Sequence, residues 1–156
     1  IMPNRFGAGI IQNNFELLGE IKYTDSEIDY ANTILKETGK ELKGLDGTIK
    51  PLRPTLPATG GSTDVGDVSQ VVPVVRLSTT TAAKDGPWHS WAVVACTGMS
   101  IGHKGMIYAS KALAMTMLDL YKNPKLIEGV KEEFIERKGD KVYVPQIPPG
   151  PPKLID

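Results

Sequence analysis

Hydrophobic residues recur at helical spacing near the start of the chain, over residues 7–18. Ile11, Phe15 and Leu18 are separated by four and three positions, so they share one helical face. Gly19 follows directly, and glycine often ends a helix because it adopts left-handed backbone without a Cβ penalty. The pattern predicts a short amphipathic helix that ends at Gly19.

A second helix is predicted from Thr24 onward. Glu27 follows Thr24 by three positions, and this pair forms the capping-box sequence that begins many helices. Lys36, Lys40 and Lys43 lie away from the apolar positions, so one face of the helix should lie on a core. The apolar stripe consists of Ile28, Ala31, Leu35, Thr38 and Leu42.

The middle of the chain is expected to be extended. Residues 44–61 are rich in Gly, Pro and Thr, and a loop of this length is usually a functional segment or a connection. Residues 70–79 contain a run of valines that predicts a buried strand, with Pro73 near its start or at an edge. Residues 92–96 form a second short apolar run, which fits either a strand or part of a loop.

The longest helix is predicted over residues 100–122, with Ser100 as its N-cap. Pro124 ends this helix and fits the first turn of the next one, which Gly139 closes. Residues 145–152 contain five prolines and should form an extended tail. The buried stripe of the long helix would consist of Met106, Ala109, Leu113, Met117 and Leu120.

These elements predict the α/β fold class, with residues 1–144 in one domain and residues 145–156 as a proline-rich extended tail. One or two strands do not make a sheet that helices can cover on both faces. We therefore expect a mostly parallel or mixed sheet, flanked by helices, whose other strands lie in a preceding segment or another chain. The chain begins with Ile1 rather than methionine, which fits a fragment of a longer protein.

Composition narrows the class of partner. Lys plus Arg and Asp plus Glu both number 18, so no net positive charge favours nucleic acid or a membrane surface. The single cysteine, Cys96, excludes a disulfide within the chain and favours a reducing compartment such as the cytoplasm. We interpret Cys96 as a small buried apolar residue. No apolar run approaches the ~20 residues that cross a bilayer.

Two histidines are candidates for chemistry. His89 lies in residues 86–91, Gly-Pro-Trp-His-Ser-Trp, a loop between apolar segments where catalytic groups are common. It fits a metal ligand, and it also fits a loop histidine that bonds to backbone. His103 falls in the first turn of the long helix, where the helix dipole favours a neutral ring. A partly exposed helix residue is the simpler interpretation of His103.

A glycine-rich segment precedes the predicted strand, with the sequence Gly-Gly-Ser-Thr-Asp-Val-Gly-Asp at residues 60–67. Paired glycines let backbone N–H groups approach an anion closely. Asp64 and Asp67 are three positions apart and could share a helical face, while a turn with an Asp N-cap explains them equally well. No Gly-Lys-Ser/Thr follows, so this is not the phosphate loop of nucleotide-binding proteins.

Three motifs in order resemble the p-aminobenzoyl-glutamate utilization family of metallohydrolases, within the aminoacylase and glutamate carboxypeptidase type. Residues 62–69 have the sequence Ser-Thr-Asp-Val-Gly-Asp-Val-Ser, and residues 87–91 have Pro-Trp-His-Ser-Trp. Residues 100–106 have Ser-Ile-Gly-His-Lys-Gly-Met, the sequence that opens a helix in this family. Residues 2–5, Met-Pro-Asn-Arg, and the proline-rich tail also match, so the resemblance covers nearly the whole chain.

The resemblance implies that residues 1–144 are the C-terminal portion of a catalytic domain, in an enzyme whose lid domain dimerises. It implies two divalent metal ions, zinc or manganese, and hydrolysis of an amide between an acyl or aroyl group and an amino acid such as glutamate. His89 matches a metal-binding histidine of the family. The other ligands and the general-base glutamate belong to the family's N-terminal half. This chain would therefore bind metal poorly alone and would need that half, or another chain.

The same resemblance implies that a glycine loop contacts the substrate carboxylate. The family's relatives have Glu and Phe at the positions of Thr63 and Val65. The sequence on both sides of Asp64 therefore departs from the family pattern. An alternative is a non-catalytic interaction module that pairs with another chain. That alternative explains the incomplete sheet and the neutral charge, but not the three motifs. The implied substrate-binding residues are Gly60, Gly61, Ser62, Asp64 and His103.

Overall fold

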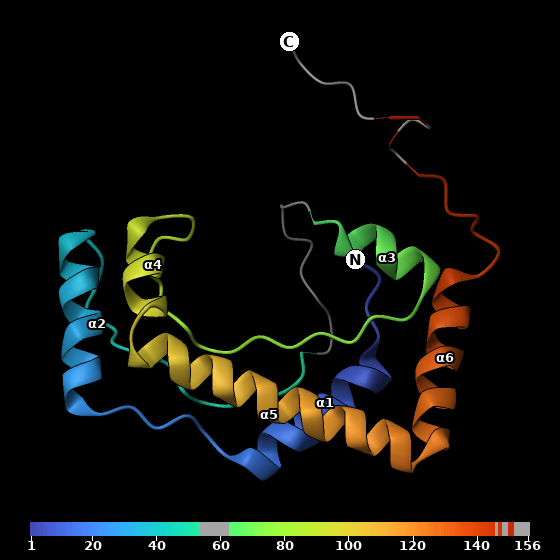
Figure 1. Cartoon of the computed structure of the whole chain (residues 1–156), viewed down its shortest axis with the longest axis horizontal. Coiled ribbons are helices and arrows are strands. Elements are labelled where there is room, and N and C mark those ends of the chain that lie inside the picture. Colours follow the sequence, from blue (N-terminus) through green and yellow to red (C-terminus); the bar gives the residue numbers. More distant parts are fainter. Residues whose placement is uncertain (54–62, 146, 148–149, 152–156) are drawn as a thin grey trace.

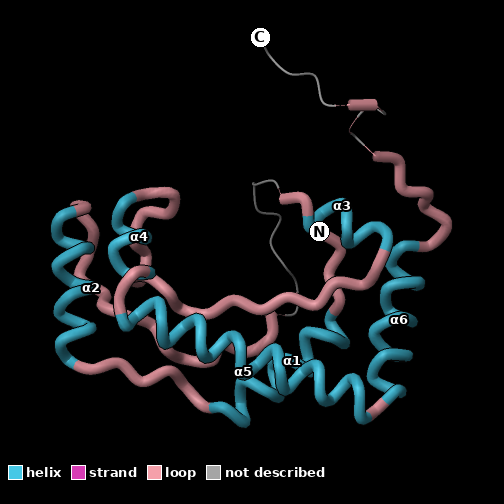
Figure 2. Tube along the Cα trace, viewed as in Figure 1, coloured by secondary structure: helices cyan, strands magenta, loops and turns pink. Residues whose placement is uncertain are grey.

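The computed structural model describes residues 1–53, 63–145, 147 and 150–151. Within these residues the ordered elements are helices, and no strand occurs (Figure 2). The helices are α1 (Arg5–Leu18), α2 (Asp25–Glu37), α3 (Val65–Val71), α4 (Trp91–Thr97), α5 (Ser100–Lys122) and α6 (Pro124–Lys138).

The expected α/β fold class is wrong for the described part of the chain. The valine-rich residues 70–79, predicted to form a buried strand, contribute only their first two residues to α3. The rest runs as irregular chain, and Val71 and Val72 are exposed. A strand exists only where a neighbouring strand accepts its backbone hydrogen bonds. Among the residues described, no such neighbour is present, so no sheet forms.

The second apolar run, residues 92–96, is helical rather than extended. Ser90 begins α4 by accepting a hydrogen bond from the backbone N–H of Ala92 at 3.3 Å. The apolar residues of α4 divide between two faces, with Ala92 and Cys96 buried and Val94 exposed. Their separation of four positions places the two buried residues on one helical face.

Figure 1 shows α5 running along one side of the molecule, with α2 and α4 near its start and α6 near its end. The segment between α3 and α4 runs alongside α5. Two glycines let this segment approach closely, because a Cβ at Gly105 would meet the Thr80 carbonyl oxygen and one at Gly7 would meet Val75. The Thr79 hydroxyl also donates to the Gly105 carbonyl oxygen at 3.2 Å.

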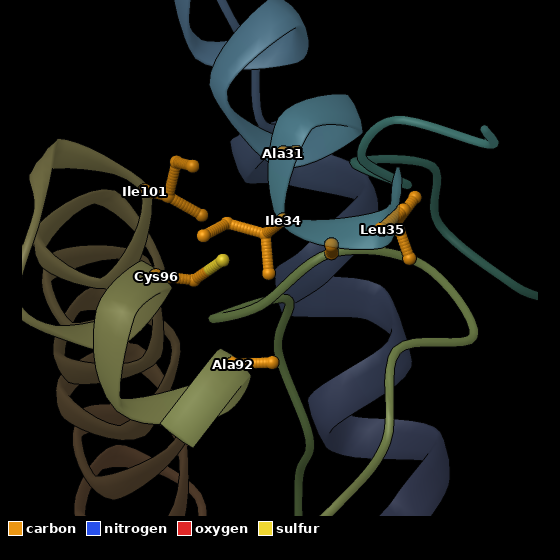
Figure 3. Packing of buried hydrophobic residues seen from close by; sticks show 7 residues of the cluster. Ala31, Ile34, Leu35, Ala92, Cys96 and Ile101 are labelled. Atoms are coloured by element: carbon orange, nitrogen blue, oxygen red, sulfur yellow. The ribbon is translucent and has the colours of Figure 1, made fainter. Parts of the chain in front are cut away.

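The buried core lies where α2, α4 and the start of α5 meet (Figure 3). Cys96 is fully buried there, which confirms its interpretation as a small apolar core residue. Because several members are alanines, the helices can approach closely around Leu35 and Ile101. The cluster consists of Ala31, Ile34, Leu35, Ala83, Ala92, Cys96 and Ile101.

The predicted helix starts are more accurate than the predicted buried faces. Thr24 and Glu27 form the expected capping box of α2, and Pro124 occupies the first turn of α6. The second helix ends at Glu37 rather than continuing to Leu42, because Gly39 takes a left-handed φ of 65°. Ser100 lies inside α5, whose N-cap is Met99.

The predicted buried stripe of the long helix is wrong. Met106, Leu113 and Met117 are exposed, and α5 instead buries small residues on its other side. Small side chains let α1 and α4 approach the α5 backbone closely. Helices α1 and α4 therefore pack on the side of α5 that carries the small residues and not on the side that carries the large apolar ones. The buried residues of α5 are Ile101, Gly102, Gly105, Ala112 and Thr116.

No helix in the described part of the chain is both long enough and apolar enough to cross a membrane. Most of residues 145–156 lies outside the described residues, so the boundary between the domain and the proline-rich tail at residue 145 stays a prediction.

Candidate functional site

His89 lies in an exposed turn immediately before α4. Its backbone has a φ of 57°, in the left-handed region that non-glycine residues rarely adopt. Asp85, in the same turn, has a φ of 60°. The side chains of His89 and of its neighbours Trp88 and Trp91 are exposed. Strained backbone of this kind persists only where the surroundings fix it, and it often occurs at functional sites.

Hydrogen bonds hold the His89 turn at both ends. The Ser90 hydroxyl donates to the Pro87 carbonyl oxygen at 2.6 Å, closing the turn around His89. At the other end, the Lys84 N–H donates to the Gly44 carbonyl oxygen at 2.9 Å. The Lys43 ammonium also lies 2.8 Å from the Asp85 carboxylate. The imidazole is therefore presented outward from a turn whose backbone is fixed.

His103 lies in the first turn of α5, and its side chain is exposed. In the chain, His89 precedes α4 and His103 follows it, so the two histidines are carried by different elements.

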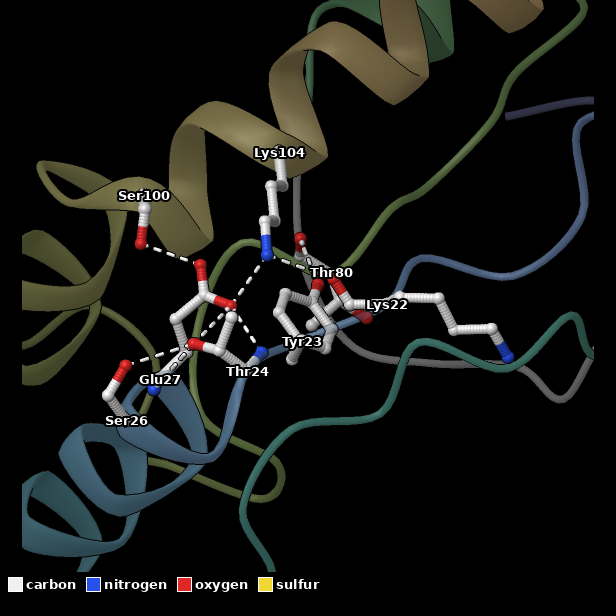
Figure 4. Close-up of polar contacts among 8 residues, drawn as sticks. All are labelled: Lys22, Tyr23, Thr24, Ser26, Glu27, Thr80, Ser100 and Lys104. Atoms are coloured by element: carbon white, nitrogen blue, oxygen red, sulfur yellow. Dashed lines mark hydrogen bonds and ion pairs between the residues drawn. The ribbon is translucent and has the colours of Figure 1, made fainter.

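The residue after His103 belongs to a polar network that joins α5 to α2 (Figure 4). The Lys104 ammonium lies 2.6 Å from Oε2 of Glu27, which is only 8% exposed. Oε1 of Glu27 accepts from the Ser100 hydroxyl at 2.7 Å, and Oε2 accepts from the Thr24 backbone N–H at 2.7 Å. The network therefore fixes the first turn of α5, where His103 lies.

The charge of Glu27 is maintained by its partners. Burial by itself raises the pKa of the Glu27 carboxyl, but the hydrogen bonds from Lys104, Ser100 and Thr24 outweigh it and lower the pKa to about 2. From its place in the sequence, Glu27 is expected only to cap a helix. Its pairing with Lys104 spans 77 positions, and the only local signal is that Lys104 lies inside one of the family motifs.

The glycine-rich segment is only partly described. Gly60, Gly61 and Ser62 lie outside the described residues, so their predicted contact with a substrate carboxylate stays a prediction. Asp64 is the N-cap of α3, as one interpretation proposed, but its side chain makes no capping hydrogen bond and is exposed. Figure 1 places α3, which begins after Asp64, apart from α4, which begins after Ser90.

Within the described residues, no group of three or more His, Cys, Asp or Glu side chains could hold a metal ion. His89 can supply one imidazole, whereas a protein-bound zinc ion normally has three or four protein ligands. The residues that the structure describes therefore do not form a complete metal site.

Two clefts on the molecule lie away from both histidines. One, of about 370 Å³, is lined by Phe15 and Tyr108 together with the segments around Asp46 and Thr79. The other, of about 450 Å³, lies between the N-terminus and the end of α6 and contains Arg137 and Lys141. Neither cleft carries a predicted site residue, so we assign the candidate site to the His89 turn and not to a cleft.

Comparison with known proteins gives two relatives. Over 104 residues, 67% of this chain, it is 33% identical to the B subunit of p-aminobenzoyl-glutamate hydrolase from Escherichia coli (strain K12). Over 74 residues, 47% of this chain, it is 38% identical to the Xaa-Arg dipeptidase of Mus musculus. No protein-family model matches the chain, and no solved structure matches it significantly.

The matched regions make up 22% of the E. coli hydrolase chain and 17% of the dipeptidase, so this chain spans about a fifth of these relatives. One relative is named as a subunit of a p-aminobenzoyl-glutamate hydrolase and the other as an Xaa-Arg dipeptidase. The resemblance indicated by the three motifs is therefore confirmed: over part of their length, this chain is related to hydrolases of the p-aminobenzoyl-glutamate hydrolase type.

Proposed function

We propose that this chain supplies part of the active site of a metal-dependent amidohydrolase. The reaction would be hydrolysis of the amide between an acyl or aroyl group and an amino acid, with p-aminobenzoyl-glutamate as the representative substrate. The observation that carries the proposal is the His89 turn. An exposed imidazole on fixed left-handed backbone lies within a motif that resembles the family, in a chain whose relatives are hydrolases.

In this proposal His89 is one ligand of a site that holds two divalent ions, zinc or manganese. Ions bound there would supply Lewis acidity toward the amide carbonyl. The remaining ligands and the general-base glutamate would come from outside this chain, since the described residues contain no further cluster of ligands. The isolated chain would then bind metal weakly and show no turnover.

Substrate binding is assigned to the residues that the motifs single out. Gly60, Gly61 and Ser62 would offer backbone N–H groups and a hydroxyl to the amino-acid carboxylate. His103 would meet the substrate from the start of α5, where the Glu27–Lys104 ion pair holds its turn in place. Asp64, at the start of α3, would contact a part of the substrate distant from the His89 turn.

The competing function is a non-catalytic interaction module. It is favoured by one specific observation, the exposure of large apolar side chains such as Trp88, Val94 and Met117. The same exposure is expected of a partial active site whose covering segments lie elsewhere, so it does not by itself separate the two functions. Whether His89 binds metal does separate the two functions.

The test is a chimera in which this chain replaces the region of the E. coli hydrolase that it matches. The chimera should bind divalent metal and hydrolyse p-aminobenzoyl-glutamate, while the isolated chain should do neither. The H89A substitution should lower both metal content and rate, whereas the control K36Q, on the exposed side of α2, should change neither. Unchanged metal content and rate in H89A would favour the interaction module, and full activity of the isolated chain would refute the partial-site proposal.

A further inference from the structure

Helix α5 has two different long faces. Its small residues pack against α1 and α4, while the opposite face carries large apolar side chains that nothing covers in the described structure. At 3.6 residues per turn these side chains lie along one side of α5 over residues 106–121, about 24 Å of the helix. They are Met106, Ile107, Leu113, Met117, Leu118 and Tyr121, between 45% and 80% exposed, and we call them the open face of α5.

The open face is unlike an ordinary solvated helix surface. Ser110 and Ala114 lie between its large members, and the exposed Lys111, four positions after Ile107 and seven before Leu118, is the one charged residue that borders the strip between Met106 and Tyr121. Monomeric proteins rarely expose a continuous apolar strip of this length unless it is a binding surface.

We propose that the open face of α5 is the docking surface for the part of a p-aminobenzoyl-glutamate hydrolase-type chain that this chain does not span. This inference rests on the proposed function. The E. coli relative has more than three quarters of its length outside the matched region, so the missing part is large enough to cover the face. A largely apolar face with a single lysine at its edge fits a permanent contact within one catalytic domain rather than a transient encounter.

The position of His103 supports this occupant over a second copy of the chain. His103 lies on the same side of α5 as Met106 and Tyr121, at the N-terminal end of the open face. Whatever covers the face therefore also reaches His103. In a hydrolase this contact brings the rest of the active site to the motif that contains His103. A second copy would instead supply the same incomplete set of site residues.

Methionine oxidation tests the proposal without relying on activity. Met106 and Met117 belong to the open face, and Met115 on the other side of the helix is a half-buried internal reference. In the isolated chain, hydrogen peroxide should oxidise Met106 and Met117 rapidly. In the chimera with the E. coli hydrolase, both rates should fall by about tenfold, and the Met115 rate should change little.

Charged substitutions provide a second measurement. The double variant L113K/M117K should keep its helix content in the isolated chain, where the face is open, and should lose soluble folded protein in the chimera. The matched control L17K replaces a leucine on α1 that is 77% exposed and outside the face, and it should be tolerated in both proteins.

Each outcome decides the proposal. A soluble chimera in which Met106 and Met117 react as fast as in the isolated chain overturns it, and so does a chimera that is insoluble without any lysine substitution. An isolated chain that sediments as a dimer with both methionines protected identifies a second copy as the occupant and also overturns it. An inactive chimera with protected methionines keeps the docking surface and rejects the hydrolase function, so the two failures are distinguishable.

Discussion

The Lys104 ammonium and the Glu27 carboxylate, 2.6 Å apart, tie the first turn of α5 to the first turn of α2. Glu27 is largely buried, whereas Lys104 is about a third exposed. Glu27 also closes the capping box of α2 with Thr24, so one carboxylate begins one helix and anchors another. We therefore expect the two helix starts to lose stability together when this carboxylate is changed.

Replacement of Lys104 by methionine should destabilise the fold. The variant keeps the apolar stem but leaves the buried Glu27 charge with only the Ser100 and Thr24 hydrogen bonds. The expected loss is about 2 kcal/mol, because an uncompensated buried charge is costly and partial exposure of Lys104 reduces the effect. Urea denaturation of K104M, E27Q and the double variant measures the coupling between the two residues. If the stability losses of K104M and E27Q were strictly additive in the double variant, they would contradict a coupling between the two residues.

The Glu27 carboxyl should make stability depend on pH in the acid range. Its pKa is about 2 in the folded protein, against an ordinary value of 4.5, so the unfolded state binds the proton more tightly. The stabilisation is fully present above pH 4.5 and is lost as the pH falls from 4.5 toward about 2. Urea midpoints measured across this range should fall more steeply for the wild type than for E27Q. Parallel curves would show that Glu27 is not the responsible group.

Two glycines in helices should respond to alanine in opposite directions. A Cβ at Gly105 would collide with the carbonyl oxygen of Thr80, so G105A should cost about 2 kcal/mol through displacement of the adjoining segment. Gly9, in α1, has open space around the same position, so G9A should stabilise by about 0.5–1 kcal/mol through its helix propensity. Thermal unfolding of both variants provides the comparison. A neutral G105A would show that residues 79–80 do not lie against α5.

Asn4, within the motif at residues 2–5, has a structural role because it joins α1 to α6. Its Oδ1 accepts from the Gly7 N–H at 2.7 Å and caps α1, and its Nδ2 donates to the Val130 carbonyl oxygen in α6 at 2.7 Å. N4A should lose both bonds, at about 2 kcal/mol. N4D should keep the cap but lose the donor to α6. Hydrogen exchange should therefore show α6 loosened in N4D and both helices loosened in N4A, and identical patterns would contradict this division.

The local elements of this protein were predictable because their signals are local. The capping box at Thr24 and the proline at the start of α6 act within one helical turn, where side chain and backbone meet without help from the fold. Cys96 was assigned to the core on residue type alone, and it is fully buried.

The errors arose where the structure depends on partners distant in sequence. The valines of residues 70–79 favour a strand, but a strand needs a neighbour, and the described chain has none. The stripe through Met106 and Met117 has the period of a buried face, yet α1 and α4 pack on the small residues opposite. Similarly, the Glu27–Lys104 pair joins residues 77 positions apart, and no local pattern indicates it.

The backbone strain at His89 can be separated from the chemistry of its imidazole. A non-glycine residue in left-handed backbone costs roughly 1 kcal/mol, and glycine removes this cost. H89G should therefore be about 1 kcal/mol more stable than H89A, and urea denaturation of the isolated chain measures the difference. In the chimera with the E. coli hydrolase, both variants should lose metal and hydrolysis equally, because both lack the imidazole. If H89G were instead much less stable than the wild type, the ring would make a structural contact, and its outward position could no longer be attributed to a ligand.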